Sequence, residues 1–163
     1  MSQQSACHFM PTKILLPIDF SSSSYAALEA AKDLAQHYQA ELCLLHVVPM
    51  LPTSIETDFL PQATFQQIER SDAEKKLATC VAALVSEGNK ASSMMETGND
   101  VVGNIMLVIE REQIDMVVIS THGLSGWRPA VFGSIAEKVV KLVQCPLLLL
   151  HSSETTSSRA ASA

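Results

Sequence analysis

Residues 115–143 read DMVVISTHGLSGWRPAVFGSIAEKVVKLV, and their pattern changes twice. Residues 115–120 form a short, continuous apolar run, which is typical of a buried strand. Residues 121–132 are rich in glycine and contain a proline, which predicts a loop. Residues 134–143 have the pattern of a helix. The stretch therefore predicts a strand, a glycine-rich loop and a helix, in that order.

The same succession of strand-like and helix-like segments extends over the rest of the chain. Short apolar runs predict further strands at residues 13–18, 41–48, 90–96 and 146–151. Helical patterns predict further helices at residues 25–38, 65–87 and 101–112. Residues 50–64 contain two prolines and no period, which predicts a long loop.

This order of elements predicts one α/β domain with a single doubly wound five-stranded parallel sheet, sandwiched by four helices. Sites in such sheets lie at the carboxyl ends of the strands, near the point where the strand order reverses. We expect residues 1–12 to be a flexible N-terminus and residues 13–151 to be the folded domain. Residues 152–163 are mainly Ser, Thr and Ala, which predicts a disordered tail.

The composition is that of a globular protein of one domain. The chain has 163 residues, 47% of them apolar and 17% charged, which is too apolar for a disordered chain. A net charge of −6 without a basic stripe argues against a surface that binds nucleic acid. A nucleotide site stays open, because backbone amides hold phosphate without Lys or Arg.

The sequence predicts no membrane segment and no targeting signal. No stretch reaches the roughly 18 consecutive apolar residues that a membrane helix needs, and the N-terminus lacks the layout of a secretory signal. Cys7, Cys43, Cys80 and Cys145 form no CxxC pair, so we expect neither a disulfide framework nor a zinc site. These observations predict a cytoplasmic protein without membrane contact.

The glycine-rich stretch has the layout of an anion site. Gly133 and Ser134 stand at the start of a predicted helix, where free backbone amides and the helix dipole attract phosphate. Gly133 lets a phosphate approach the backbone, and the Ser134 hydroxyl donates one more hydrogen bond. Gly123 and Gly126 let the loop fold back over a ligand. In the alternative interpretation these glycines only make turns and Ser134 only caps the helix.

Several motifs along the chain resemble those of the universal stress protein family. Its signature, Gly-x2-Gly-x9-Gly-Ser/Thr, corresponds here to Ser120-x2-Gly123-x9-Gly133-Ser134. The resemblance extends to KILLPIDFS at residues 13–21, LLHVV at 44–48, GSIAEKVV at 133–140 and CPLLLL at 145–150. It implies a universal stress protein domain over residues 13–151, with a fold like that of the adenine nucleotide alpha hydrolases.

The resemblance also implies which residues would meet the nucleoside of bound ATP. Pro17 and Asp19 would flank the adenosine, with Asp19 near the ribose or the base, and Val47 would pack on the adenine. Ile119 and Ser120 would meet the nucleoside through backbone groups. The structural alternatives stay open: Asp19 caps the first helix, Pro17 only ends a strand, and Val47 is ordinary core.

At the other end of the ligand, the resemblance implies a phosphate site. Gly123, Gly133 and Ser134 would hold the phosphates, with the amide of Ile135 nearby. A Mg²⁺ ion would be carried on the phosphates, because no cluster of carboxylates stands near the loop. The chain has no GxxxxGK[ST] motif, so it is not a Walker-type ATPase.

Three residues leave the function open. Ser120 replaces the first signature glycine and puts a Cβ and a hydroxyl where the nucleoside would pass. His46 interrupts a buried strand, which is typical of a core histidine bonded to backbone. His122 lies in the loop and would orient it. Neither histidine has an evident acid partner in the sequence.

Three hypotheses follow. The leading one is an ATP-binding universal stress protein, a regulatory module in the stress response with at most slow hydrolysis. The second is a dimeric interaction scaffold of the same fold that binds no nucleotide, and the third is an enzyme that uses His122 or Asp19. Separately, the apolar last strand predicts a homodimer through residues 147–151, as the family resemblance also implies.

Overall fold

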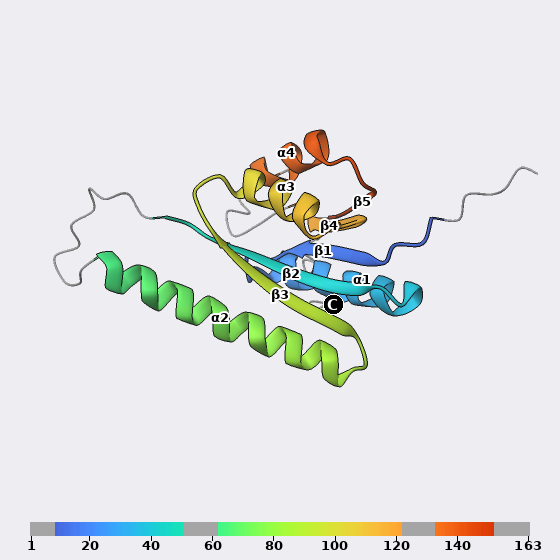
Figure 1. Ribbon diagram of the computed structural model, residues 1–163, viewed down its shortest axis with the longest axis horizontal. Helices are drawn as coiled ribbons and strands as arrows, with labels where there is room; N and C mark the ends of the chain where they lie inside the picture. The colour runs from blue at the N-terminus through green and yellow to red at the C-terminus, as the bar shows by residue number, and fades with distance from the viewer. Residues whose placement is uncertain (1–8, 51–61, 122–132, 152–163) are drawn as a thin grey trace, which may run out of the picture.

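The computed structural model describes residues 9–50, 62–121 and 133–151. Strands and helices alternate along these residues, as Figure 1 shows. The strands are β1 (Lys13–Pro17), β2 (Glu41–Val48), β3 (Lys90–Thr97), β4 (Met116–Ser120) and β5 (Leu147–Leu150). The helices are α1 (Ser22–Tyr38), α2 (Gln62–Ser86), α3 (Val101–Arg111) and α4 (Ser134–Leu142).

The five strands form one parallel sheet in the order β3-β2-β1-β4-β5. The chain builds outward from β1 to β3 and then crosses to the other side of β1 for β4 and β5. The strand order therefore reverses between β1 and β4. This arrangement confirms the predicted α/β fold, a doubly wound five-stranded parallel sheet between four helices.

The two faces of the sheet bury separate cores, because successive residues of a strand point to opposite faces. Figure 1 shows α1 and α2 on one face and α3 and α4 on the other. Leu16 and Leu44 belong to the core under α1 and α2. Leu15 and Leu45 belong to the core under α3 and α4. Ala27, Ala31 and Ala35 are buried along α1 and let that helix lie close to the sheet.

Two helices begin earlier than the sequence predicts. Helix α1 begins at Ser22, because the Ser21 hydroxyl accepts a hydrogen bond from the Ser24 amide at 3.2 Å and caps the helix there. Helix α2 begins at Gln62, so the loop prediction is wrong for residues 62–64, while residues 51–61 lie outside the described residues. No side chain of residues 64–72 is buried, so packing against the sheet does not mark where α2 begins.

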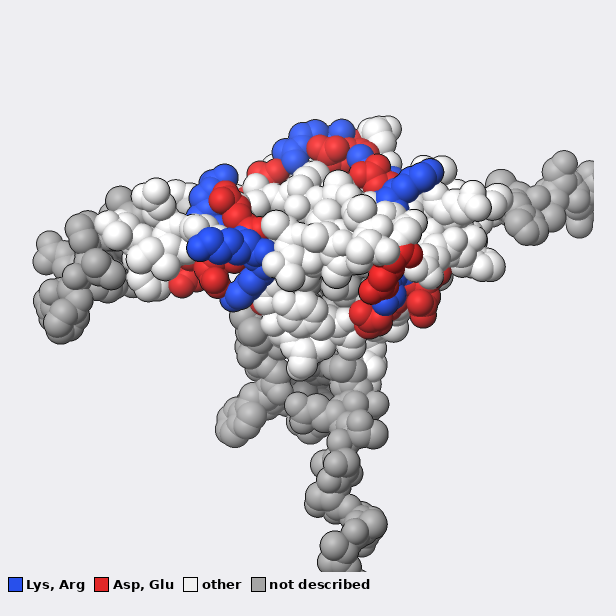
Figure 2. Space-filling model, turned by 90° about the horizontal axis from the view of Figure 1, so that it is seen from below, with Lys and Arg blue, Asp and Glu red and all other residues white. Residues whose placement is uncertain are grey.

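Charged side chains form mixed pairs on the surface. Lys32 pairs with Glu29 at 2.6 Å and with Glu87 at 3.0 Å, and Lys76 pairs with Asp72 at 2.7 Å. On the face that Figure 2 shows, basic side chains lie beside acidic ones around a broad area without charged side chains. No helix among the described residues is long and apolar enough to cross a membrane.

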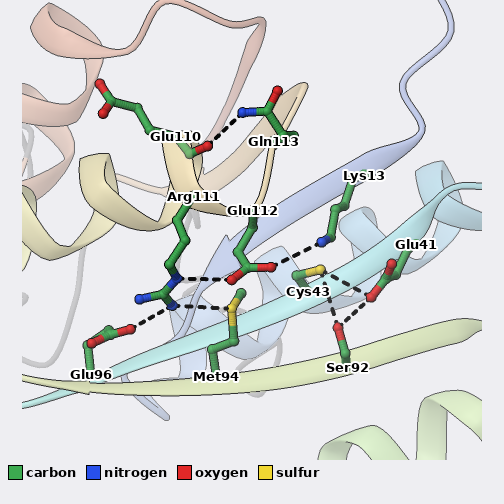
Figure 3. A network of polar contacts seen from close by, with 10 residues as sticks. All are labelled: Lys13, Glu41, Cys43, Ser92, Met94, Glu96, Glu110, Arg111, Glu112 and Gln113. Atoms are coloured by element: carbon green, nitrogen blue, oxygen red, sulfur yellow. Dashed lines mark hydrogen bonds and ion pairs between the residues drawn. The ribbon is translucent and has the colours of Figure 1, made fainter.

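A polar network connects the end of α3 to the sheet, as Figure 3 shows. Arg111 donates to Glu96 of β3 at 2.8 Å and to Glu112 at 3.0 Å, and Lys13 of β1 reaches Glu112 at 3.4 Å. These side chains are partly exposed, so water screens the pairs and each contributes little to stability. Most of the stability therefore comes from the two apolar cores.

Cys43 lies beside this network and is fully buried in β2. Its Sγ is 3.3 Å from Ser92 Oγ, the contact drawn in Figure 3. Burial raises the pKa of Cys43 to about 11, so the thiol stays protonated at neutral pH. In the part of the chain that the structure describes, Cys43, Cys80 and Cys145 are free thiols, and no cluster of side chains there has a metal-binding arrangement.

Asp115, which precedes β4, holds the start of β1. Its carboxylate accepts from the Thr12 amide at 2.8 Å, the Thr12 hydroxyl at 2.7 Å and the Lys13 amide at 3.0 Å. Burial alone would raise the pKa of Asp115, but these hydrogen bonds outweigh it and lower the pKa from its ordinary value of 3.8.

We expect Asp115→Asn to lower the free energy of unfolding at pH 7 by about 1–3 kcal/mol, because hydrogen bonds to a charged acceptor are lost. A depressed pKa stabilises the fold above the unfolded-state pKa, and that stabilisation disappears as pH falls through the folded-state value. The difference between wild type and variant should therefore shrink below pH 3.8. Urea unfolding at pH 7 and pH 3 measures it.

The matched control for this prediction is Glu110→Gln, which neutralises an exposed carboxylate of α3. The control should leave stability unchanged at both pH values. An Asp115→Asn deficit of the same size at pH 3 and pH 7 would show that the charge does not matter.

Candidate functional site

The candidate site lies where the strand order reverses. Strand β1 pairs with β2 as far as Pro17↔Leu45, and β4 pairs with β5 as far as Ser120↔Leu150. The ladder between β1 and β4 comprises only Ile14↔Met116 and Leu15↔Val117. The last residues of β1 and β4 therefore do not pair with each other, and this is the position at which α/β sheets bind ligands.

The sheet brings the predicted nucleoside residues to one edge. Pro17 ends β1, Val47 lies near the end of β2, and Ile119 and Ser120 end β4. Val47 and Ile119 pack with the core under α3 and α4, and alternation from Leu15 directs Pro17 to that face as well. Three neighbouring strands thus present Pro17, Val47 and Ile119 on the face where α4 lies. Val47 also packs against this core, as the structural alternative for this residue predicted.

Asp19 lies two residues after the end of β1, in a turn that leads to α1. Its Oδ1 accepts from the Ser21 amide at 3.0 Å and from the Ser21 hydroxyl at 2.5 Å. The interpretation that Asp19 caps α1 is wrong, because the capping side chain is that of Ser21. Asp19 instead forms a turn of its own with Ser21, which leaves its carboxylate at the carboxyl end of β1.

The ends of the glycine-rich stretch meet beside β4. The Gly133 amide donates to the Thr121 carbonyl at 2.7 Å, and the Thr121 amide donates to the Leu150 carbonyl at 2.8 Å. The chain therefore enters and leaves residues 122–132 at one place, next to the carboxyl end of β4. Gly123 and His122 lie outside the described residues.

Helix α4 begins at this point without a side-chain cap. Gly133 is its N-cap, and the helix's first hydrogen bond runs from the Glu137 amide to the Gly133 carbonyl at 3.0 Å. The amides of Ser134, Ile135 and Ala136 precede that bond, so the helix supplies no acceptor for them. The interpretation that Ser134 caps the helix is wrong, because Ser134 is its first helical residue and is exposed.

The start of α4 differs from the starts of α1 and α3. Ser21 caps α1 and Asp100 caps α3, each through a side-chain oxygen. Gly133 has a φ of −55°, which every residue type adopts, so its backbone conformation does not require glycine. A bare N-cap with outward amides at the positive end of a helix dipole is suited to an anion such as phosphate.

The histidine and threonine beside the site have structural contacts. His46 Nδ1 lies 2.7 Å from the Ile18 carbonyl oxygen, which confirms the prediction of a histidine bonded to backbone. Thr121 is buried, and its Oγ1 lies 3.1 Å from His151 Nδ1. Nothing in the local sequence singles out Thr121, because its role depends on partners distant in the chain.

The structure also contains a cavity away from this site. It has a volume of about 410 Å³ and lies between α1 and α2, where Tyr25, Leu28, Cys80 and Leu84 contribute to its lining. None of the predicted site residues that the structure describes lines it. It opens on the face opposite α4, so it is separate from the ends of β1 and β4.

Comparison with known proteins identifies relatives over nearly the whole described chain. The model of the universal stress protein family matches residues 10–151. The universal stress protein YxiE of Bacillus subtilis is 29% identical over 149 residues, which cover 87% of this chain and 100% of that protein.

Solved structures with the same fold support this match. The MJ0577 protein of Methanocaldococcus jannaschii superposes with a TM-score of 0.79 at 25% identity, covering 90% of this chain and 100% of that one. The universal stress protein from Archaeoglobus fulgidus in complex with dAMP superposes with a TM-score of 0.62 at 17% identity, covering 86% and 98%.

Proposed function

Because the chain belongs to the universal stress protein family, we propose that it binds an adenine nucleotide, ATP, at the carboxyl ends of β1 and β4. The observation that carries the proposal is the start of α4, which has no side-chain cap. A hydrogen bond of 2.7 Å from the Gly133 amide to the Thr121 carbonyl holds this start beside β4. A related structure with dAMP supports adenine as the base.

In this proposal the nucleoside lies against the ends of three strands. Asp19 accepts a hydrogen bond from the ribose or the base, as carboxylates do with hydroxyl and amino groups. Pro17, Val47 and Ile119 supply apolar surface for the adenine, and Ser120 meets the nucleoside through its backbone. Ser120 ends β4 and is half-buried. Because its side chain is small, the proposed nucleoside can approach the backbone there.

The phosphates lie at the start of α4. The amides of Ser134 and Ile135 donate to them, the Ser134 hydroxyl adds a donor, and Gly123 contributes from the glycine-rich stretch. A Mg²⁺ ion rides on the phosphates, because it binds substrate phosphate readily and keeps several waters. The sequence has no Walker lysine, so we propose at most slow hydrolysis of the nucleotide. The proposed role is regulatory, in the stress response and in the cytoplasm.

Thermal unfolding with and without millimolar ATP and Mg²⁺ tests the proposal. A ligand at 100 times its dissociation constant adds about 2.7 kcal/mol, which raises Tm by about 5–10 °C in a domain of this size. Asp19→Ala should reduce that shift. No shift, together with no copurified nucleotide, would favour the scaffold hypothesis.

We also propose a homodimer through β5. This strand lies at the edge of the sheet, and all four of its leucines are only partly buried. Val140 and Leu142 of α4 are 45% and 56% exposed. Together these side chains offer apolar surface and an unpaired strand edge, which favour association of two copies.

Light scattering at micromolar concentration measures the proposed dimer. We expect a mass of twice 17.6 kDa, because burying the leucines of β5 is favourable in water. A mass of 17.6 kDa at all concentrations would contradict the dimer without affecting the nucleotide proposal.

A further inference from the structure

We propose that His46 is a positioning residue of the nucleotide site, which holds the Asp19 turn from both sides. The inference rests on the proposed function, since the turn matters to a ligand only if one binds there. His46 lies in β2 and does not line the ends of β1 and β4 directly. It acts through the two residues that flank Asp19.

The first contact is with the residue before Asp19. His46 Nδ1 is 2.7 Å from the Ile18 carbonyl oxygen. A carbonyl oxygen only accepts hydrogen bonds, so Nδ1 carries the proton. The Ile18 amide donates to the Leu45 carbonyl at 2.8 Å. Both backbone groups of Ile18 are therefore held by β2, one residue past the last pair of the β1–β2 ladder.

The second contact is with the residue after Asp19. The Phe20 ring lies against the His46 imidazole, with 4.6 Å between the ring centroids. Phe20 has a φ of 63°, a left-handed conformation that is unfavourable for an aromatic residue. Such a conformation persists only where the surroundings hold it. His46 supplies part of that support, and Lys76 of α2 lies over the same ring at 5.4 Å.

One side chain thus fixes the carbonyl before Asp19 and the ring after it. With both neighbours held, the Asp19 carboxylate keeps the turn in which Oδ1 accepts from the Ser21 amide at 3.0 Å. Without His46 we expect the turn to sample other conformations. A ligand that needs this carboxylate would then have to order the turn as it binds, which lowers its affinity.

Two variants separate the hydrogen bond from the ring contact. His46→Phe keeps an aromatic ring but removes the donor, whereas His46→Asn keeps an N–H donor near the position of Nδ1. Titration calorimetry with ATP and Mg²⁺ should show affinity falling about tenfold in His46→Phe, the equivalent of one hydrogen bond. His46→Asn should recover part of that affinity, because it restores the donor but not the ring contact with Phe20. His37→Phe, at an exposed histidine of α1, is the matched control and should bind as wild type does.

Hydrogen exchange of the Ser21 amide gives a second readout that needs no ligand. We expect faster exchange in His46→Phe, intermediate exchange in His46→Asn, which keeps a donor but loses the ring contact with Phe20, and near wild-type exchange in His37→Phe. If His46→Phe does not fold, Phe20→Gly replaces it, because glycine adopts the positive φ while the ring contact is lost. Phe20→Gly should also speed the exchange and weaken ATP binding.

The outcomes distinguish this inference from the proposed function. If wild type binds ATP but His46→Phe binds equally well with unchanged Ser21 exchange, His46 is not a positioning residue. If wild type binds no ATP, the proposed function fails, and Ser21 exchange alone decides whether His46 holds the turn. Unchanged exchange in both His46→Phe and Phe20→Gly would overturn the inference in either case.

Discussion

Gly133→Asp should leave the fold intact and weaken ATP binding at least about 100-fold. Aspartate is among the best N-cap residues, so the start of α4 should be as stable as in wild type. Its carboxylate would stand where the proposed phosphates bind, and two like charges about 4 Å apart repel by on the order of 4 kcal/mol near a protein surface. Calorimetric titration with ATP measures the loss, and thermal unfolding without ligand checks the fold.

The matched control is Gly133→Asn, which has nearly the same size and an equally good N-cap but no charge. This control separates the effect of charge repulsion from the effect of side-chain size. We expect its affinity for ATP to fall by about tenfold at most. Gly133→Val is less informative, because valine is a poor N-cap and would also weaken the helix. If Gly133→Asp binds ATP as tightly as wild type, the phosphates do not lie at the start of α4.

Leu44→Ala should destabilise the protein more than any surface change. Leu44 is completely buried in β2, in the core under α1 and α2. Truncating a buried leucine costs about 2–5 kcal/mol, because apolar contacts are lost and a cavity remains. For a domain of this size that lowers Tm by about 5–20 °C. Urea and thermal unfolding measure the change.

Leu107→Ala is the matched control for the core prediction. Leu107 lies on α3 and is 63% exposed, so its truncation should change stability by about 0.5 kcal/mol or less. Equal losses in the two variants would mean that Leu44 does not lie in a packed core.

The order and type of the described elements could be predicted because most of them carry a local signal. Glu41–Val48 is apolar nearly throughout, as a strand covered on both faces must be. The sequence predicted the start of α2 three residues late, at residue 65, because no side chain of residues 64–72 is buried and packing does not mark where the helix begins. Where a helix extends beyond the sheet it packs on, burial does not constrain its residues, so its exact end is hard to predict from sequence.

The contacts around the candidate site could not be predicted from the sequence. Ser21, Asp19 and Ser134 are all good capping types, and only the backbone path shows that Ser21 alone among them caps a helix. His46 was predicted to bond to backbone, but nothing local identifies its acceptor, Ile18, 28 residues away. The short ladder between β1 and β4 depends on the whole sheet, so no segment reveals it.

The hydrogen bond between Thr121 and Gly133 has a consequence for engineering. It holds Thr121 and Gly133, the residues on either side of residues 122–132, at one point beside β4. Segments of other lengths grafted between Thr121 and Gly133 should leave the sheet and α4 in place, because loop closure costs little more as a loop grows. The two fixed ends thus make residues 122–132 a place where sequence and length can be exchanged on a constant frame.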